Sequence, residues 1–186
     1  MQLRYAIQLQ CMMKAMADVV LPAVDPDNRL AQEQARLILG TLSLMAKQLP
    51  LQFRFDCDAL GRSVALAQEL LQQLGTLQDI EGAQERLAAR MATATEVLAR
   101  ALADPQELVS AIHGLREAIG AVVGDVSARA STAQVASVQK CVLEHGKEQL
   151  LRDRSWLLAQ NWEPNPESVP PIETLLGNAR GVGAMT

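Results

Sequence analysis

The chain contains two histidines, and each is followed by an acidic residue on the same helical face. This spacing could support metal binding or catalysis. His113 precedes Glu117 by four positions and His145 precedes Glu148 by three, which places each pair on one side of a helix. Imidazole and carboxylate groups at this spacing can ligate a metal ion. The Glu-x-x-His signature of di-iron bundles is absent, because serine and valine stand three positions before the two histidines. The sequence therefore predicts no metal site and no cofactor.

The segment around His113 has a second interpretation. From Ala111 to Glu117 it reads Ala-Ile-His-Gly-Leu-Arg-Glu, with Arg116 three positions after the histidine. This short pattern resembles the phosphoacceptor helix of histidine phosphotransfer domains, which are four-helix bundles, and it implies that His113 accepts the phosphoryl group. Glu117 departs from the family, which has a small residue there, and its charge would oppose a phosphoryl group on His113. The alternative is a structural histidine beside an apolar stripe.

Three cysteines, Cys11, Cys57 and Cys141, are far apart in the chain and form no Cys-x-x-Cys pair. An odd number of scattered cysteines is typical of reduced thiols in a cytosolic protein. Cys57 lies between Asp56 and Asp58, and these carboxylates are expected to raise its pKa and make it a poor nucleophile. None of the three is therefore expected to act in catalysis.

A glycine within an apolar helical stripe marks a candidate ligand site at His145 and Gly146. Glycine lowers helix stability by about 1 kcal/mol relative to alanine, so its presence indicates either a close helix approach or a ligand contact. Met12 and Met16 could line an adaptable apolar pocket or fill gaps in an aliphatic core. An apolar, acyl-type small molecule held between helices is therefore the alternative binding partner.

Arginine and tryptophan gather near the end of the last long helix, and both are enriched at interface hot spots. The two tryptophans could equally cap a bundle core. Four of the eight prolines then fall between residues 163 and 171, which predicts an extended strap followed by one apolar turn. This tail could pack on its own bundle or dock on a partner subunit. The candidate interface residues are Arg152, Arg154, Trp156, Trp162, Leu175 and Leu176.

Composition excludes several classes of protein. The 186 residues are 49% hydrophobic but only 3% aromatic, so the core must be aliphatic. The net charge is −4 and the basic residues are scattered, which argues against nucleic-acid binding. No apolar segment is long enough to cross a membrane, and the first residues do not resemble a signal peptide. We therefore expect a cytoplasmic protein that binds neither nucleic acid nor membrane.

Four long segments in the middle of the chain are predicted to be helices, over residues 58–74, 77–103, 105–130 and 132–161. Tight turns between such helices imply antiparallel neighbours. The apolar residues expected on their packed faces include Ile80, Leu87, Met91, Leu98 and Leu102 in the second helix, Leu108, Ile112, Leu115, Ile119, Val122 and Val126 in the third, and Val135, Val138, Val142, Leu143, Leu150, Leu157 and Leu158 in the fourth.

The helix ends carry their own signals. Gly75 is expected to take a left-handed conformation after the first of these helices, with Thr76 and Asp79 capping the next one. Asp104, followed by proline and by an acid at the third position, is the strongest start signal. Ser131 and Gln134 form a similar but weaker pair, so residues 105–161 could be one bent helix or two.

Residues 3–9 and 51–55 alternate apolar and polar side chains, which is the period of a strand. Composition favours a helix over residues 3–21, ended by Pro22. A second helix is expected to run to about Gln48, and either Asp25 with Pro26 or Asn28 can cap its start. We expect residues 51–56 to be an extended crossover whose phenylalanines cap the bundle, with a strand pairing as the alternative.

These observations predict one all-α domain over residues 1–162: an up-and-down bundle of four long helices, two N-terminal helices packed on it, and a Pro-rich strap over residues 163–186. No catalytic motif is evident, so the prediction favours a protein without enzymatic activity. Its expected function is protein–protein contact, with itself as a homodimer or with another protein. The alternatives are an apolar-ligand-binding bundle or enzyme and a phosphotransfer protein that uses His113.

Overall fold

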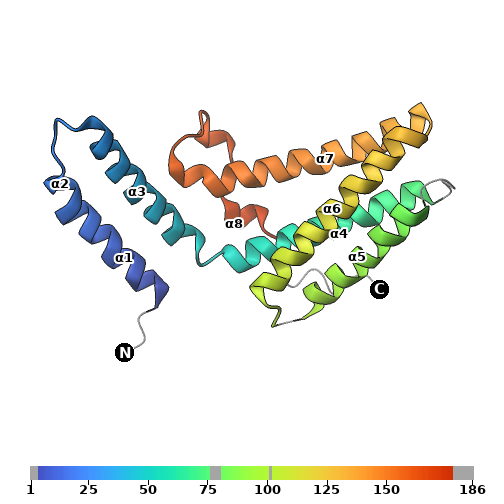
Figure 1. Cartoon of the computed structure of the whole chain (residues 1–186), viewed down its shortest axis with the longest axis horizontal. Helices are drawn as coiled ribbons and strands as arrows, with labels where there is room; N and C mark the ends of the chain where they lie inside the picture. The colour runs from blue at the N-terminus through green and yellow to red at the C-terminus, as the bar shows by residue number, and fades with distance from the viewer. Residues whose placement is uncertain (1–3, 76–80, 101, 178–186) are drawn as a thin grey trace. The chain divides into compact units, whose positions relative to one another are not determined.

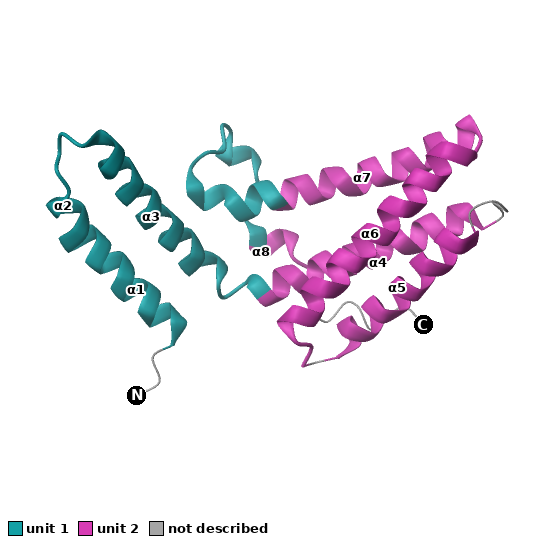
Figure 2. Cartoon of the chain, in the orientation of Figure 1, with its two compact units in different colours: residues 1–52, 153–172 teal, residues 53–152, 173–186 magenta. Residues whose placement is uncertain are grey.

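A computed structural model describes residues 4–75, 81–100 and 102–177 (Figure 1). Every regular element in these ranges is helical and none is a strand, which confirms the predicted all-α class. No helix in the same ranges has the length and apolarity needed to cross a bilayer. Two compact units divide the chain: unit 1 comprises residues 1–52 and 153–172, and unit 2 comprises residues 53–152 and 173–186 (Figure 2).

Unit 2 is a bundle of four long helices around one aliphatic core, as the sequence predicts. The helices are α4 (Gln52–Leu74), α5 (Glu81–Ala99), α6 (Pro105–Arg129) and α7 (Thr132–Leu157). The core takes buried side chains from all four helices, such as Leu60, Leu87, Leu115 and Val138. Helices α5 and α6 lie side by side (Figure 1).

The start of α6 confirms the strongest end signal in the sequence. The Asp104 carboxylate accepts a hydrogen bond from the Gln106 N–H at 2.7 Å, and the Glu107 carboxylate accepts one from the Asp104 N–H at 3.3 Å. Ser131 and Gln134 form the second predicted pair, in which the Ser131 N–H donates to the Gln134 amide oxygen at 3.0 Å. The chain therefore breaks between α6 and α7, and residues 105–161 are not one long helix. The predicted stripe of α6 is buried throughout: Leu108, Ile112, Leu115, Ile119, Val122 and Val126.

Two predictions at the ends of α4 and α5 are wrong. Gly75 does not take a left-handed conformation, since no described glycine has positive φ. A side chain satisfies the helix end instead, because the Gln84 amide donates to the Leu74 carbonyl at 2.8 Å. Helix α5 ends at Ala99, so Leu102 lies beyond the helix and is 95% exposed. The expected cap of Thr76 and Asp79, and the core position of Ile80, lie outside the described residues.

The predicted crossover at residues 51–56 is also wrong, as is its strand alternative. Helix α4 begins at Gln52, six residues earlier than predicted. In a helix, the alternating residues 53 and 55 point in different directions. Phe53 is exposed, whereas the ring of Phe55 lies 4.7 Å from the guanidinium of Arg152. This long-range contact, which a local pattern cannot indicate, accompanies the helical conformation.

The predicted apolar face of α7 is only partly correct. Val138 is buried and Val135 and Val142 pack against the core. Leu143, Leu150 and Leu157, by contrast, are exposed by 63%, 60% and 46%. They follow one another at seven-residue intervals on one side of the helix, while the side buried in unit 2 continues through Cys141 and Arg152. Helix α7 thus buries valines together with Cys141 and Arg152, and it turns a row of leucines outward.

Unit 1 contains the N-terminal helical hairpin. Its first arm comprises α1 (Tyr5–Ala15), a π-helical turn η1 (Met16–Val20) and α2 (Leu21–Ala23), and its second arm is α3 (Arg29–Gln48). The strand alternative is therefore wrong from Tyr5 onward, and Leu3 lies outside the described residues. Asn28, one of the two predicted caps, caps α3 by accepting a hydrogen bond from the Ala31 N–H at 3.1 Å.

Pro22 does not end the first arm at its predicted position, because helical structure continues to Ala23. The Leu21 N–H bonds to the Met16 carbonyl, which is five residues earlier. This π register immediately precedes the proline, whose ring would otherwise clash with the carbonyl four residues before it. A wider turn thus accompanies Pro22 within the arm.

The Pro-rich strap folds back on the end of α7. After a 3-10 turn η3 (Leu158–Gln160), Asn161 reverses the chain with a left-handed φ of 60°. Glu163 binds Arg154 through two hydrogen bonds, at 2.8 and 2.9 Å, and the Ser155 hydroxyl donates to the Pro170 carbonyl at 2.7 Å. The strap is not extended throughout, since it contains a second 3-10 turn, η4 (Pro166–Ser168), before the short helix α8 (Ile172–Leu175).

The capping box provides a test of the fold. Replacement of Asp104 by alanine removes the side-chain acceptor at the start of α6 and should lower the free energy of unfolding of unit 2 by about 1–2 kcal/mol. Urea denaturation followed by far-ultraviolet circular dichroism measures this loss. The exposed Glu117 in the middle of the same helix is the matched control, and Glu117→Ala should change the stability by less than about 0.5 kcal/mol. Equal stability of the two variants would contradict the role assigned to Asp104.

Candidate functional site

Polar contacts run along the side of α7 that faces α4. Four pairs connect the two helices: Gln73 with Ser137, Glu69 with His145, Arg62 with Glu148, and Asp58 with Arg152. Residue numbers fall along α4 as they rise along α7, so the helices are antiparallel. We call this set of contacts the α4–α7 seam. It contains two clusters of polar and ionisable side chains.

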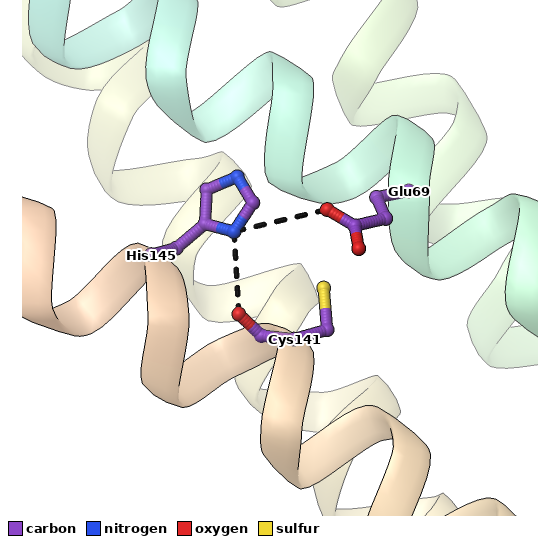
Figure 3. A group of neighbouring side chains, drawn as sticks. All are labelled: Glu69, Cys141 and His145. Carbon is purple, nitrogen blue, oxygen red and sulfur yellow. Dashed lines mark hydrogen bonds and ion pairs between the residues drawn. The ribbon is translucent and has the colours of Figure 1, made fainter.

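The first group joins a carboxylate, a thiol and an imidazole (Figure 3). Cys141 and His145 lie one turn apart on α7, and Glu69 reaches them from α4. One potential ligand atom from each residue lies within 4.8 Å of the other two. The Nδ1 atom of His145 is 3.9 Å from a carboxylate oxygen of Glu69 and 3.2 Å from the Cys141 carbonyl oxygen. Cys141 is buried, His145 is half-buried and Glu69 is about half exposed, so the group lies at the edge of the core.

The electrostatics of this group disfavour nucleophilic chemistry. Burial, a hydrogen bond from the thiol to the Glu69 carboxylate, and the charge of that carboxylate raise the pKa of Cys141 to about 11. The thiol is thus protonated at neutral pH, where only a thiolate would attack a substrate. The predicted rise in the pKa of Cys57 is confirmed, with burial as the larger cause and the charge of Asp56 as the smaller.

The second group is an ionic network around Asp58. Its carboxylate accepts hydrogen bonds from the Arg152 and Arg62 guanidinium groups, both at 2.9 Å, and from the Gly177 N–H at 3.0 Å. Arg152 is 1% exposed and also donates to Gln149 at 2.8 Å. A buried arginine at the centre of such a network is stabilising only while its carboxylate partner is present. The geometry therefore indicates a structural role for Asp58 and Arg152.

Arg62 connects this network to the tail. Its guanidinium binds the exposed Glu148 at 2.7 Å and donates to the Leu175 carbonyl at 3.2 Å. Leu176, next in the chain, is buried. Within unit 2, the tail therefore packs on its own bundle, which was the first of the two alternatives drawn from the sequence.

The candidate interface residues lie in different environments. Arg152 is inside the network and Leu176 is buried, so neither presents its side chain to a partner. Leu175 and Trp156 are half-buried, and Arg154 is paired with Glu163. Trp162, at 73% exposed, is the candidate most accessible to another molecule. The interface roles of these residues remain predictions. Burial argues against such a role for Arg152 and Leu176 only.

The candidate ligand residues belong to different units, His145 and Gly146 to unit 2 and Met12 and Met16 to unit 1. His145 belongs to the group with Glu69, and a Cβ atom at Gly146 would meet nothing within 4 Å, so the close helix approach expected there is wrong. Met12 is exposed and Met16 half-buried in unit 1. A hollow of about 330 Å³ in unit 1 is lined by Pro26, Arg29, Gln32, Glu33 and Arg36, which are mostly polar and do not suit an acyl chain.

His113, the candidate for phosphotransfer, is exposed on α6. Glu117 follows it by one helical turn, so the carboxylate that departs from the phosphotransfer pattern lies on the same face. In the structure, as in the sequence, the charge of Glu117 would therefore oppose a phosphoryl group on His113.

Sequence reasoning missed Glu69, Cys141 and Asp58 as site residues. Only the spacing of Cys141 and His145, four residues apart, was visible as a signal, since it places both on one helical face. The two acidic residues meet partners far along the chain: Glu69 lies beside Cys141, 72 residues away, and Asp58 binds Arg152, 94 residues away.

The buried and exposed members of the Asp58 network should contribute differently to the free energy of unfolding. Asp58→Ala would remove the carboxylate that lies 2.9 Å from the buried guanidinium of Arg152 and should cost about 3–5 kcal/mol in the free energy of unfolding. Glu148→Ala removes an exposed partner of Arg62 and should cost less than about 1 kcal/mol. Urea denaturation followed by circular dichroism would show the difference. A small loss for Asp58→Ala would mean that the network does not stabilise unit 2.

The raised pKa of Cys141 should control the rate at which its thiol is alkylated. In metal-free buffer, alkylation of Cys141 should accelerate about tenfold per pH unit from neutral pH up to about 11, because only the thiolate reacts. Glu69→Gln removes the charge and the acceptor that raise the pKa, so it should accelerate alkylation of Cys141 at neutral pH. Mass spectrometry of timed digests measures each site separately, and Cys57 serves as the internal control. An unchanged rate at Cys141 would contradict the contact with Glu69.

Comparison with known proteins adds no further assignment to this geometry. No protein-family model, curated protein or solved structure matches this chain significantly.

Proposed function

We propose that this chain is a non-enzymatic helical protein that works through protein–protein contact, as a homodimer formed by the α1–α3 hairpin. The exposed apolar surface of the hairpin carries the proposal. Residues that are roughly half exposed or more lie on both helices: Tyr5, Ile7 and Met12 on α1, and Leu30, Leu37, Ile38 and Met45 on α3. Exposed apolar surfaces of this kind mark sites of association.

The hairpin has little core of its own. Among residues 4–52, only Leu9, Ala35 and Leu44 are buried apolar side chains. Most of the stability of a helix in a protein comes from burying its apolar face against other elements. A partner that covers the exposed faces of α1 and α3 would supply the missing burial.

A second copy of the chain fits this surface. Seven-residue spacing relates Tyr5 to Met12, Leu30 to Leu37 and Ile38 to Met45, and such spacing suits helices that pack side by side at a shallow angle. Two identical hairpins could therefore form a symmetric four-helix contact. Charge does not oppose it, since residues 1–52 contain five basic and four acidic side chains.

The leucine row on α7 is a different exposed surface. Leu143, Leu150 and Leu157 share the seven-residue spacing, but the helix that carries them already contributes to the core of unit 2. Helix α7 therefore depends less than the hairpin does on a partner that would bury its exposed apolar side chains. This row serves as the matched comparison in the test below.

The proposal includes a cytoplasmic location. All three cysteines are free thiols, and Cys11 is exposed on α1. An exposed thiol on an apolar association surface is better suited to a reducing compartment than to an oxidising one.

Substitution of the two surfaces tests the dimer. Leu37→Glu combined with Ile38→Glu should weaken dimerisation at least about a hundredfold, because each buried aliphatic side chain contributes about 1.5–3 kcal/mol. Leu143→Glu combined with Leu150→Glu should leave the dimer intact. Sedimentation equilibrium of the untagged full-length chain measures the association, and circular dichroism checks that helicity is kept. A monomeric wild type, or a dimer dissociated only by the α7 substitutions, would overturn the proposal.

A further inference from the structure

The group formed by Glu69, Cys141 and His145 combines three different ligand types. A carboxylate, a thiol and an imidazole each offer one donor atom, and all three atoms lie within 4.8 Å of one another. Figure 3 shows the three side chains converging from two helices. This combination differs from the Asp58 network, in which the basic groups are guanidiniums that cannot ligate a cation.

The seam positions these donors from both sides. Cys141 and His145 share a face of α7 because they are four residues apart. On one side of the group, the Ser137 hydroxyl donates to Gln73 at 3.2 Å. On the other side, Arg62 binds Glu148 at 2.7 Å. The backbones that carry the three donors are therefore held in register before any ligand arrives.

We propose that Glu69, Cys141 and His145 bind one divalent cation of the zinc class, with a fourth coordination position open to solvent. Calcium and magnesium prefer sites made of oxygen atoms, whereas thiolate and imidazole favour zinc and similar transition metals. Three protein ligands with a fourth open position are also a known arrangement for zinc. Small side-chain movements would bring the donors from their present separation to ligand distance.

Charge supports the assignment. The bound cation would replace the proton of the Cys141 thiol: a bond forms between the metal and sulfur, the S–H bond breaks, and the proton passes to the buffer. Two positive charges would then face one thiolate and one carboxylate, with a neutral imidazole. The site would be neutral overall, which suits its place at the edge of an aliphatic core.

Cobalt(II) is the probe for this site, because it takes zinc positions and gives a visible spectrum. Untagged full-length protein, stripped of metal with a chelator, should bind one Co²⁺ per chain and show a thiolate-to-cobalt charge-transfer band. Added Zn²⁺ should abolish the band. The absence of this band, or its appearance at half a metal ion per chain, would overturn the proposal.

Matched variants identify the ligands. Cys141→Ser should lose the charge-transfer band, and His145→Gln and Glu69→Gln should each weaken binding at least about a hundredfold. Two control variants should bind Co²⁺ as the wild type does. Cys57→Ser alters a different thiol, which lies on α4, and His113→Gln alters the other histidine. Retention of the band in Cys141→Ser, or its loss in Cys57→Ser, would place the metal elsewhere and contradict the assignment.

A measurement on the wild type avoids variants that fail to fold. Zn²⁺ should protect Cys141 from alkylation while Cys11 and Cys57 continue to react, as mass spectrometry of digests would show. Equal reactivity of Cys141 with and without Zn²⁺ would overturn the proposal. All three donors belong to one chain, so the result does not depend on whether the hairpin forms a dimer.

Discussion

The ion pair between Arg152 and Asp58 is the constraint on which the rest of unit 2 depends. A guanidinium cannot lose its charge in a protein, and that of Arg152 is almost fully buried. A carboxylate must therefore remain within reach, which permits one alignment of α4 against α7. Sliding either helix by a residue would move Asp58 away from its partner. The same alignment brings Glu69 opposite Cys141 and His145, so the candidate metal site is a consequence of the pairing further along the seam.

Local chemistry explains which parts of the fold could be predicted. The start of α6 depends on residues within four positions of Asp104, and its packed stripe repeats every three or four residues, so both are readable from a short stretch of sequence. The helical start of α4 and the burial of Arg152 on α7 depend on contacts between distant segments. Phe55 meets Arg152 across 97 residues, and no local period contains that information. At Gly75 the sequence indicated a helix end but not that Gln84 would satisfy it.

The candidate site was hidden for the same reason. The sequence shows Cys141 and His145 at helical spacing, but their carboxylate partner is 72 residues away from the cysteine and belongs to a face of α4 that otherwise looks solvent-exposed. An acidic residue on an amphipathic helix is normally part of a solvated surface. Only the register of two packed helices distinguishes Glu69 from the other glutamates. The outward leucines of α7 illustrate the converse, since an apolar period identifies a stripe but not which stripe is buried.

The uneven distribution of aromatic residues has a practical consequence for spectroscopy. Trp156 and Trp162, together with Tyr5, all belong to unit 1, whereas unit 2 contains only the two phenylalanines. Intrinsic fluorescence therefore reports on unit 1, which includes the last turn of α7 with Trp156, whereas residues 53–152 are almost silent to it. Far-ultraviolet dichroism detects the helices of both units. Fluorescence and dichroism therefore report on different parts of the chain. Comparing the two signals during one denaturation would reveal whether the two units unfold together as a single cooperative body.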